Sequence, residues 1–550
     1  MNKALPVLRI LRTLRPLKPK QLLAQIRHGL RGTGRPIAWR GAAPHWRHSG
    51  LGADFLPPPA HIEVNEGAVI QLLGSSLDVS RGVDWDCAEH GPLFAYHLHQ
   101  FDFARRESVS PEARLAWMLD WMERHPRGTG WDPHPLGLRI LSWGKMLQTV
   151  GALPERAGTD AGLHESLARQ IETLAENLEV RLQANHLLSN LIGVVFGGLL
   201  FDGPEAQRWL GYWPQLKAEL ARQVPGDGLH EERSPMYHAL LLENILDLLN
   251  LAASPDGMAP DGMVSTLQSV ARRMRGALDM MCHPDGQIAL FADSAFGIAQ
   301  HPSDLEAYAD RLGVTAPPTQ SVLPEGGYAR LVAGPFTVIA SVAGPAPAHQ
   351  PGHAHCDALA FELSYGSQRI VTDTGVFEYI PGERRQVSRA TASHSTLEVA
   401  DTEQAEIWAA HRVGGRPRVL LESVEPEKTI VASCRGWSTP DTLHRRRFCV
   451  EEHALEIRDA LQGNRRSMRL FLHLAPGLEP RLSHDRDGGT EAHLRLIDGA
   501  WLRIALPVSV NWRIGESPYY PSFGCEKTRA CLIGEADRFD QGSFRFEIAN

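Results

Sequence analysis

Cysteine is scarce in this chain, and its distribution excludes two common kinds of site. Seven cysteines occur among 550 residues, and no two of them form a Cys-x-x-Cys pair. An odd, scattered set is not typical of a disulfide framework, and it lacks the paired spacing of a cysteine zinc site. We therefore expect most of the cysteines to be buried thiols.

A long hydrophobic run is also missing. The most apolar stretch, residues 191–201, is far shorter than the roughly 20 residues that a helix needs to span a bilayer. Residues 1–32 are basic and contain leucines, but Pro6 and Pro16 interrupt them and no continuous apolar segment typical of a secretory signal is present. We interpret residues 1–60 as a basic N-terminal arm, exposed or forming a surface helix, with docking to a membrane surface or a partner as the alternative. We expect a cytoplasmic protein, with a periplasmic or envelope-associated one as the alternative.

The chain carries no excess of positive charge. It has 56 Lys and Arg against 64 Asp and Glu, a formal net charge of −8. This argues against a nucleic-acid partner, whereas an anionic substrate could still bind in a locally basic groove. We find no phosphate-binding P-loop, no glycine-rich dinucleotide motif, and no opposed pair of carboxylates of the kind that glycosidases use.

Two halves of the chain differ in their hydrophobic pattern, and the length allows about two to four domains. Residues 61–315 are predicted to be helical, because apolar residues recur there at spacings of three and four. One such stripe consists of Leu163, Leu167, Ile171 and Leu174. After a proline-bearing boundary at 315–325, short β-rich runs alternate with turn residues over residues 325–550. We expect a multidomain α+β protein, with a helical array or toroid followed by an antiparallel β-sandwich.

The strongest chemical signal is the segment Gly352-His353-Ala354-His355-Cys356-Asp357. On a strand, its two histidines and its aspartate would point to one face, with the imidazoles roughly 7 Å apart. Such a group can bind a divalent metal or move protons. A polar, solvated sheet face is the alternative.

Further polar residues follow in both halves. Asp373 ends an apolar run, and His394 lies in a Ser/Thr-rich loop. With His355 they would complete a site of two histidines and a carboxylate, which suits zinc. In the helical half, Asn185-His186 and Tyr237 could face a site or could serve as capping and packing groups.

Together these segments resemble the heparinase II/III-like family of polysaccharide lyases, over roughly residues 85–400 and more weakly beyond. The matching segments are Trp131-Asp132-Pro133 with Arg139, Asn185-His186, Glu232 to Tyr237, Phe291-Ala292-Asp293-Ser294, His353 to Phe361, Thr372 to Gly375, and His394-Ser395-Thr396-Leu397. The resemblance implies an α/α toroid, an incomplete barrel of helices, followed by an antiparallel β-sandwich. It also implies a site in the cleft between the two domains.

The resemblance also implies roles for single residues. Asn185, with His186, would bind the uronate carboxylate, and Tyr237 and His353 would transfer protons. The implied metal ligands are His355, Asp373 and His394, with one zinc ion as the expected cofactor and Asp357 as a rival for Asp373. We further expect substrate contacts from Arg139, Glu232 and Arg389, and name Arg384, Arg385 and Arg412 as other candidate anion contacts, since guanidinium groups match planar anions.

These roles fit β-elimination in a uronic-acid-containing, anionic glycan. A group that neutralises the uronate carboxylate stabilises the anion that forms when the C5 proton leaves, and an acid protonates the leaving oxygen. Tyrosine ionises near pH 10, so nearby cations or a metal would have to lower its pKa for it to act as the base. The alternatives are a non-catalytic glycan-binding or exopolysaccharide-pathway protein, and a metal-dependent glycan hydrolase. The sequence does not indicate the oligomeric state.

Overall fold

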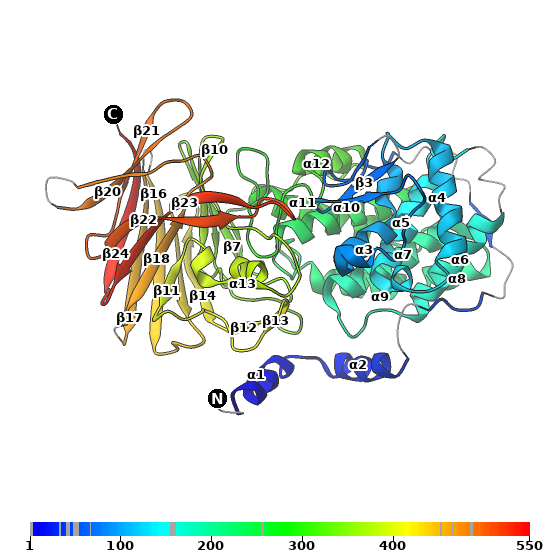
Figure 1. Cartoon of the computed structure of the whole chain (residues 1–550), viewed down its shortest axis with the longest axis horizontal. Helices are drawn as coiled ribbons and strands as arrows, with labels where there is room; N and C mark the ends of the chain where they lie inside the picture. The colour runs from blue at the N-terminus through cyan, green and yellow to red at the C-terminus, as the bar shows by residue number, and fades with distance from the viewer. Residues whose placement is uncertain are drawn as a thin grey trace.

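The computed structural model has a helical domain and a β domain side by side (Figure 1). It describes residues 4–31, 35–39, 44–47, 54–65, 68–154, 161–254, 258–451, 454–464, 466–484 and 488–549. All seven cysteines lie in these ranges as free thiols, four of them buried. In the described part of the chain, no helix combines the length and the apolar character that crossing a membrane requires.

The helical domain is an α/α toroid of antiparallel helices. Its helices are α3 (Gly91–Gln100), α4 (Pro111–Arg124), α5 (Pro133–Gln148), α6 (Ala161–Glu176), α7 (Ala184–Leu200), α8 (Pro204–Leu210), α9 (Trp213–Gln223), α10 (Pro235–Ala252), α11 (Met263–Met280) and α12 (Pro302–Arg311). Proline occupies the first turn of several of them, where a missing N–H costs no hydrogen bond. Helices α5 and α7 cross so closely that a Cβ on Gly193 would lie 3.0 Å from the Cα of Gly137.

Short strands also occur in the region that the sequence predicts as helical. Strands β2 (Glu63–Asn65), β3 (Val69–Leu72) and β4 (Ser75–Asp78) form an antiparallel sheet. β1 (His45–Trp46) pairs with β5 (Phe201–Asp202), so part of the predicted arm belongs to the helical domain. These strands have two to four residues each, too few to leave a clear period in the sequence.

The β domain is an antiparallel sandwich. One sheet has the order β10-β9-β8-β7-β6, another β14-β15-β16-β17-β24-β21-β20-β19, and a third β11-β18-β23-β22. The strands are β6 (Val322–Leu323), β7 (Tyr328–Ala333), β8 (Phe336–Ser341), β9 (Phe361–Tyr365), β10 (Gln368–Val371), β11 (Leu397–Val399), β14 (Arg418–Glu425), β15 (Thr429–Arg435), β16 (Thr442–Glu451), β17 (Ala454–Gly463), β18 (Met468–His473), β19 (Arg481–His484), β20 (Thr490–Arg495), β21 (Trp501–Ala505), β22 (Asn511–Tyr519), β23 (Lys527–Ala536) and β24 (Gln541–Ala549). The three sheets share one core, to which Phe361, Phe448 and Leu470 each contribute from a different sheet.

The two domains contact each other through a hydrophobic cluster that is separate from the core of either domain. Met280 and Met281 at the end of α11 pack in one buried cluster with Leu323 of β6 and Tyr328 of β7. Helix α12 ends at Arg311 and β6 begins at Val322, so the chain passes from one domain to the other between them. We call this contact region the seam. Its apolar packing holds the loops of the two domains against each other.

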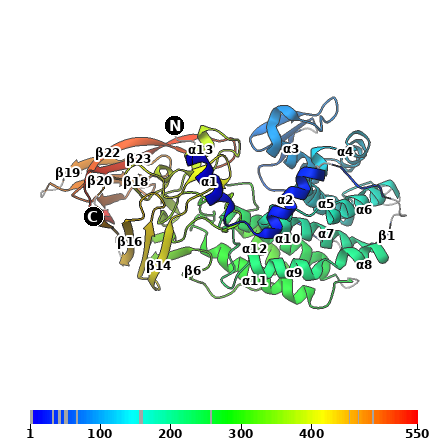
Figure 2. The same ribbon diagram turned by 90° about the horizontal axis from the view of Figure 1, so that it is seen from below.

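Helices α1 (Ala4–Leu14) and α2 (Pro19–Arg31) lie along the outside of both domains (Figures 1 and 2). Arg12 donates to Glu406 in the β domain at 2.8 and 2.6 Å. Gln21 donates to the carbonyl of Arg181 beside α7, at 3.5 Å, and to that of His349 in the β domain, at 3.4 Å. The arm therefore spans the outside of the seam.

Candidate active site

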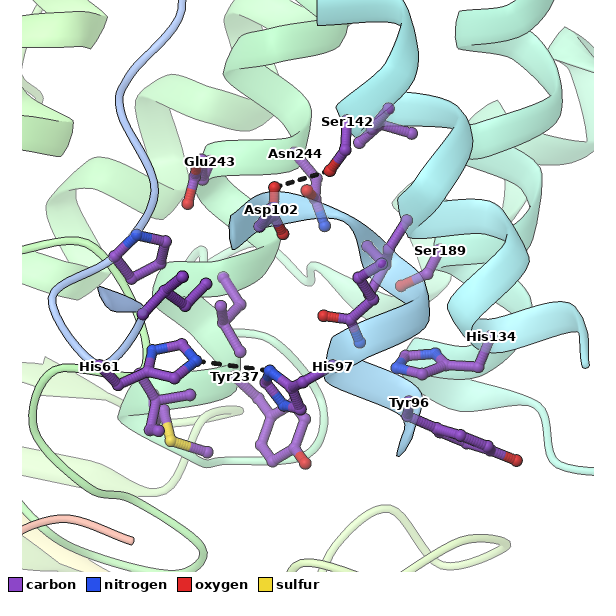
Figure 3. Close-up of a pocket in the computed structure, with 18 of the residues that line it drawn as sticks. His61, Tyr96, His97, Asp102, His134, Ser142, Ser189, Tyr237, Glu243 and Asn244 are labelled. Carbon is purple, nitrogen blue, oxygen red and sulfur yellow. Dashed lines mark hydrogen bonds between the residues drawn. The ribbon is translucent and has the colours of Figure 1, made fainter. Parts of the chain in front are cut away.

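A cavity at the seam brings together polar side chains from distant parts of the chain (Figure 3). Asn185 belongs to the first turn of α7 and Tyr237 to the first turn of α10. Tyr379 comes from the loop before α13 (Glu383–Arg389). The polar lining includes Tyr96, His97, His134, Asn185, Tyr237 and Tyr379.

Local backbone geometry places Tyr237 and Asn185 in this cavity. Ser234 caps α10 by accepting a hydrogen bond from the backbone N–H of Tyr237, at 3.2 Å. At the start of α7, Gln183 and Ala184 have φ angles of 62° and 47°. Such angles are costly for residues other than glycine, and they often mark functional sites. The strained turn directs Asn185 into the cavity.

Tyr237 and His353 are brought together across the seam. Their ring centroids lie 4.0 Å apart, and the Tyr237 hydroxyl is 3.1 Å from that of Tyr379. Burial raises the pKa of Tyr237 well above its usual value of 10.0. The lowered pKa that Tyr237 would need to act as the base, through neighbouring cations or a metal, is not found for the metal-free protein, and the hydroxyl remains protonated at neutral pH.

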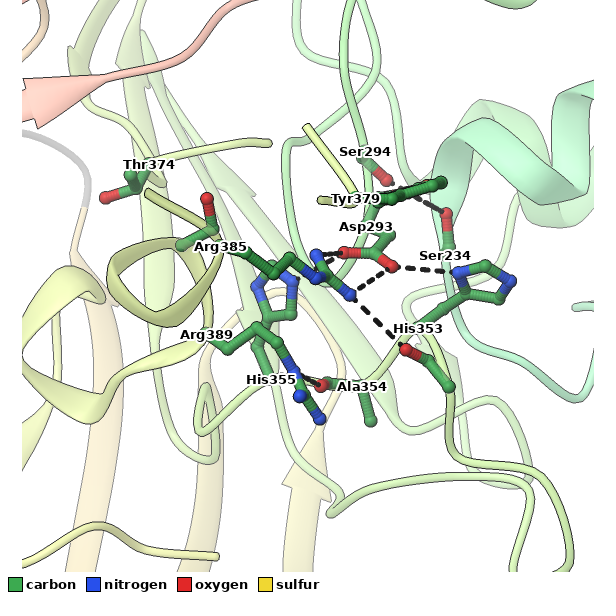
Figure 4. Close-up of polar contacts among 12 residues, drawn as sticks. Ser234, Asp293, Ser294, His353, Ala354, His355, Thr374, Tyr379, Arg385 and Arg389 are labelled. Atoms are coloured by element: carbon green, nitrogen blue, oxygen red, sulfur yellow. Dashed lines mark hydrogen bonds and ion pairs between the residues drawn. The ribbon is translucent and has the colours of Figure 1, made fainter. Parts of the chain in front are cut away.

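Asp293 is the centre of the polar contacts behind this pair (Figure 4). Its carboxylate accepts from Nδ1 of His353 and from Nε2 of His355, both at 2.8 Å. Arg385 of α13 donates to both of its oxygens. Burial alone would raise the pKa of Asp293, but Arg385 and the two histidines hold it well below the usual value. With Nδ1 of His353 bound to an ionised carboxylate, Nε2 is the nitrogen left for proton transfer.

The His353 segment is not a strand, contrary to the sequence prediction. Residues 349–360 form a loop, and β9 begins only at Phe361. His353 and His355 reach the same carboxylate because the loop folds over Asp293, not because alternate residues share a sheet face. Asp357, the third polar residue of the motif, is buried, and its burial raises its pKa to about 6.

Glu232 lies beneath the cavity floor. It is 2% exposed, it accepts from the backbone N–H of Asn185 at 3.2 Å, and its other oxygen is 3.8 Å from Nε2 of His353. In the described part of the chain that second oxygen and Oδ1 of Asn185 have no hydrogen-bond partner. Glu232 thus lies against Asn185 and His353, and its role as a substrate contact stays a prediction.

His186 forms a cluster with two other residues next to the cavity. Its Nδ1 is 3.1 Å from Oε2 of Glu179, and its ring centroid is 4.7 Å from that of His134. Although burial alone would raise the pKa of Glu179, the neighbouring His186 lowers it to about 2. Nitrogen and oxygen atoms of the three residues lie within 4.8 Å of one another, so the cluster could hold a metal ion as well as an ion pair.

The predicted zinc ligands lie on the β-domain side of Asp293. Nδ1 of His394 is 2.8 Å from Asp373, and the rings of His355 and His394 are 5.4 Å apart. Nδ1 of His355 and Nε2 of His394 are buried and have no hydrogen-bond partner within the described residues. The donor set thus suits a divalent cation, but its atoms do not converge as closely as those of the His186 cluster.

Two arginines predicted to contact substrate, Arg139 and Arg389, have guanidinium groups that are buried and bound to the protein's own groups in this structure. Arg139 is fully buried, donates to the carbonyls of His99 and Gly130, and stacks on Trp121 with 3.9 Å from its guanidinium carbon to the ring centroid. Arg389 is equally buried. It donates to the backbone carbonyls of Ala354, Ala409, Ala410 and Arg412.

Two further anion candidates are also engaged within the protein. Arg385 is bound to Asp293, and Arg384 pairs with Glu526 at 3.0 Å. The sequence pattern assigns no role to Asp293, and it does not single out Tyr379. The only signal for Asp293 was its place among the matching segments, since its partners lie 60 to 92 residues away in the sequence.

Comparison with known families agrees with this architecture. The family described as "Heparinase II/III N-terminus" matches residues 117–310, and "Heparinase II/III-like, C-terminal" matches residues 315–532. Together the two cover most of the chain and divide it at the seam. The chain belongs to the heparinase II/III-like family.

Two curated proteins are similar to this chain at 27% and 26% identity. "FtsZ-localized protein C" of Caulobacter vibrioides is 27% identical over 390 residues, which is 66% of this chain and 64% of that protein. "Heparin-sulfate lyase" of Pedobacter heparinus is 26% identical over 315 residues, 50% of this chain and 46% of that protein. The match thus spans less than two thirds of the length of either relative.

Solved structures share the fold at low sequence identity. A structure of heparinase III has a TM-score of 0.68 at 17% identity, over 96% of this chain and 89% of that one. Heparan sulfate lyase HepC from Pedobacter heparinus has a TM-score of 0.59, also at 17% identity, over 96% and 88%. These likenesses establish the toroid and the β domain as a shared architecture.

Proposed function

We propose that this protein is a polysaccharide lyase that cleaves an anionic, uronic-acid-containing glycan by β-elimination. The observation that carries the proposal is the contact between Tyr237 and His353 at 4.0 Å beside a cavity that Asn185 also lines. A phenol and an amide in one cavity, with an imidazole against the phenol, supply an acid, a carboxylate-binding group and a base. The glycan lyases among the relatives support a glycosaminoglycan-like substrate.

In this mechanism the Asn185 side chain binds the uronate carboxylate. Its buried Oδ1 has no hydrogen-bond partner within the described residues, so its amide is not committed to the protein. A hydrogen bond from the amide to the carboxylate stabilises the charge that develops when C5 loses its proton. His186 lies at the same end of α7, where its contact with Glu179 favours the charged form of the imidazole. Burial alone would lower the pKa of His186, but Glu179 outweighs it and raises the pKa.

His353 takes the C5 proton and Tyr237 supplies the other proton. Nδ1 of His353 is bound to Asp293, so Nε2 accepts the C5 proton as the C4–O bond breaks and a C4=C5 double bond forms. Because burial keeps Tyr237 protonated, its hydroxyl donates to the leaving glycosidic oxygen. Proton exchange with water then restores both groups. This division assigns the two proton transfers, which the resemblance implies for Tyr237 and His353 together, to one residue each.

The test is an assay of the full chain on a panel of uronic-acid polysaccharides. The proposal predicts an unsaturated uronate product, seen as a rise in ultraviolet absorbance, and no product from His353→Ala. New reducing ends without that absorbance would indicate a hydrolase. Binding of the glycans without any cleavage would indicate a non-catalytic glycan-binding protein. Either result would refute lyase activity.

We further propose that His355, Asp373 and His394 hold one zinc ion. The support is the donor set: two buried imidazole nitrogens without hydrogen-bond partners in the described residues, and a buried carboxylate. Burial lowers the pKa of His355 to about 4, so the ring is neutral, as a ligand must be. When bound, the metal would supply a structural cross-link between the loops that carry His355 and His394.

Elemental analysis tests the zinc proposal directly. We expect about one equivalent of zinc per chain, and its loss in His394→Ala. Glu179→Gln serves as the matched control, because it alters the other histidine cluster and should leave this zinc in place. If zinc remains in His394→Ala and disappears in Glu179→Gln, the metal is bound by the cluster of His134, Glu179 and His186, and the proposal is refuted.

A further inference from the structure

Helices α1 and α2 turn their apolar side chains away from the protein. Leu11 is 56% exposed, and Leu23 and Ile26 are 62% and 64% exposed. Among the side chains that the structure describes on the two helices, the large exposed apolar residues are Val7, Leu8, Ile10, Leu11, Leu14, Leu22, Leu23 and Ile26. At helical spacing they form one face on each helix. A surface helix of a globular protein normally buries this face.

The orientation is fixed by polar contacts on the opposite side. Arg12 pairs with Glu406, and Trp408 donates from Nε1 to the hydroxyl of Thr13, at 3.1 Å. On α2, Gln21 is the buried residue, and it bonds to backbone carbonyls of both domains. Rotating either helix to bury its leucines would break these contacts. The structure therefore presents the apolar face to whatever lies outside the molecule.

The charged residues of the arm itself are all basic, although Arg9 and Arg12 pair with Glu406 and Lys20 lies 3.9 Å from Glu219. Residues 1–53 contain no Asp or Glu, although the whole chain has a net charge of −8. Arg9, Lys20 and Arg27 are exposed on the two helices and Arg15 directly after α1, next to the apolar residues. A second copy of this chain would bring the same positive charges together, whereas an anionic surface would attract them.

We propose that α1 and α2 bind the surface of a bilayer that contains anionic phospholipid. Helices of 11 and 13 residues are too short to cross it but can lie in its plane. Their leucines enter the boundary between headgroups and acyl chains, and their basic residues bind the phosphates. Because the arm is fixed to both domains, the membrane would hold the whole molecule, and with it the cavity at the seam.

Co-sedimentation of the full chain with lipid vesicles tests this proposal. The vesicles are phosphatidylcholine with phosphatidylglycerol, and phosphatidylcholine alone. We expect binding to the first that weakens with added salt, and much weaker binding to the second. The triple variant Leu11→Gln, Leu23→Gln, Ile26→Gln should bind at least ten-fold more weakly. The matched control replaces three exposed apolar residues of the β domain, Leu420→Gln, Ile497→Gln and Val508→Gln, and should bind like the wild type.

Three outcomes would overturn the proposal. In the first, the wild type does not sediment with either vesicle. In the second, the β-domain control loses as much binding as the arm variant. In the third, the wild type forms a dimer that only the arm variant disrupts and shows no vesicle binding, which would make a second copy the occupant. The test is independent of lyase activity, since none of the substituted residues lies near the cavity.

Discussion

Tyr237→Phe removes one hydroxyl from the cavity and leaves the aromatic ring against His353. If that hydroxyl protonates the leaving oxygen, turnover should fall about 10²- to 10⁴-fold, the usual contribution of a proton-transfer group. This corresponds to about 3 to 5 kcal/mol of activation free energy. The cost in folding should be smaller, because the structure shows one hydrogen bond lost, to Tyr379 at 3.1 Å, worth about 1 kcal/mol net.

Tyr379→Phe is the matched control, because it removes the other end of the same hydrogen bond. Both variants should therefore lose a similar amount of stability, measured by denaturant unfolding. Only Tyr237→Phe should lose most of its rate of unsaturated-product formation on the substrate that the panel identifies. Near wild-type turnover in Tyr237→Phe, or equal losses in both variants, would show that the hydroxyl acts through packing alone and would refute its role as the acid.

Three other substitutions test the surroundings. Asn185→Ala should lower kcat/KM about 10²- to 10³-fold with little change in unfolding, since its Oδ1 has no partner to lose among the described residues; an unchanged kcat/KM would remove it from the site. Arg385→Met leaves the buried carboxylate of Asp293 without its cation and should cost about 3 to 5 kcal/mol of unfolding free energy; a cost under about 1 kcal/mol would contradict the ionised Asp293. Glu179 has a pKa lowered to about 2, so its carboxylate stabilises the fold above its ordinary pKa of 4.5 and loses this effect as the pH falls toward 2. The stability difference between wild type and Glu179→Gln, on the order of 3 kcal/mol near neutral pH, should shrink below about pH 4.5, and a difference that grows in acid would reverse the assignment.

The sequence predicted the division into a helical and a β half because each half repeats its own period many times. It could not predict the loop at residues 349–360, where His353 and His355 alternate as they would on a strand. Both histidines instead donate to one carboxylate, that of Asp293, which lies far away in the sequence. Local pattern gives no information about such a partner.

Two of the arginines predicted to contact substrate are enclosed by the protein for a related physical reason. A guanidinium group has five donors, and a ring of backbone carbonyls can satisfy it as well as a substrate anion can. Arg389 is held in this way, and Arg139 is held by two carbonyls, by Gln170 and by the face of Trp121. Whether an arginine faces solvent or carbonyl groups depends on the tertiary fold, which composition and spacing do not specify.

Asp293 connects the two chemistries proposed for this protein. One of its oxygens fixes the tautomer of His353, the proposed base, and the other orients His355, a proposed zinc ligand. Arg385 stabilises the charge that both contacts require, and it belongs to α13 of the β domain, whereas Asp293 lies in the loop after α11 of the toroid. Asp293 is thus a positioning residue, because it acts on the reaction only through His353. Any displacement of the β domain relative to the toroid would disturb the hydrogen bond between Asp293 and His353 and so the position of the proposed base. A variant that loosens the seam should therefore lower kcat more than it alters KM.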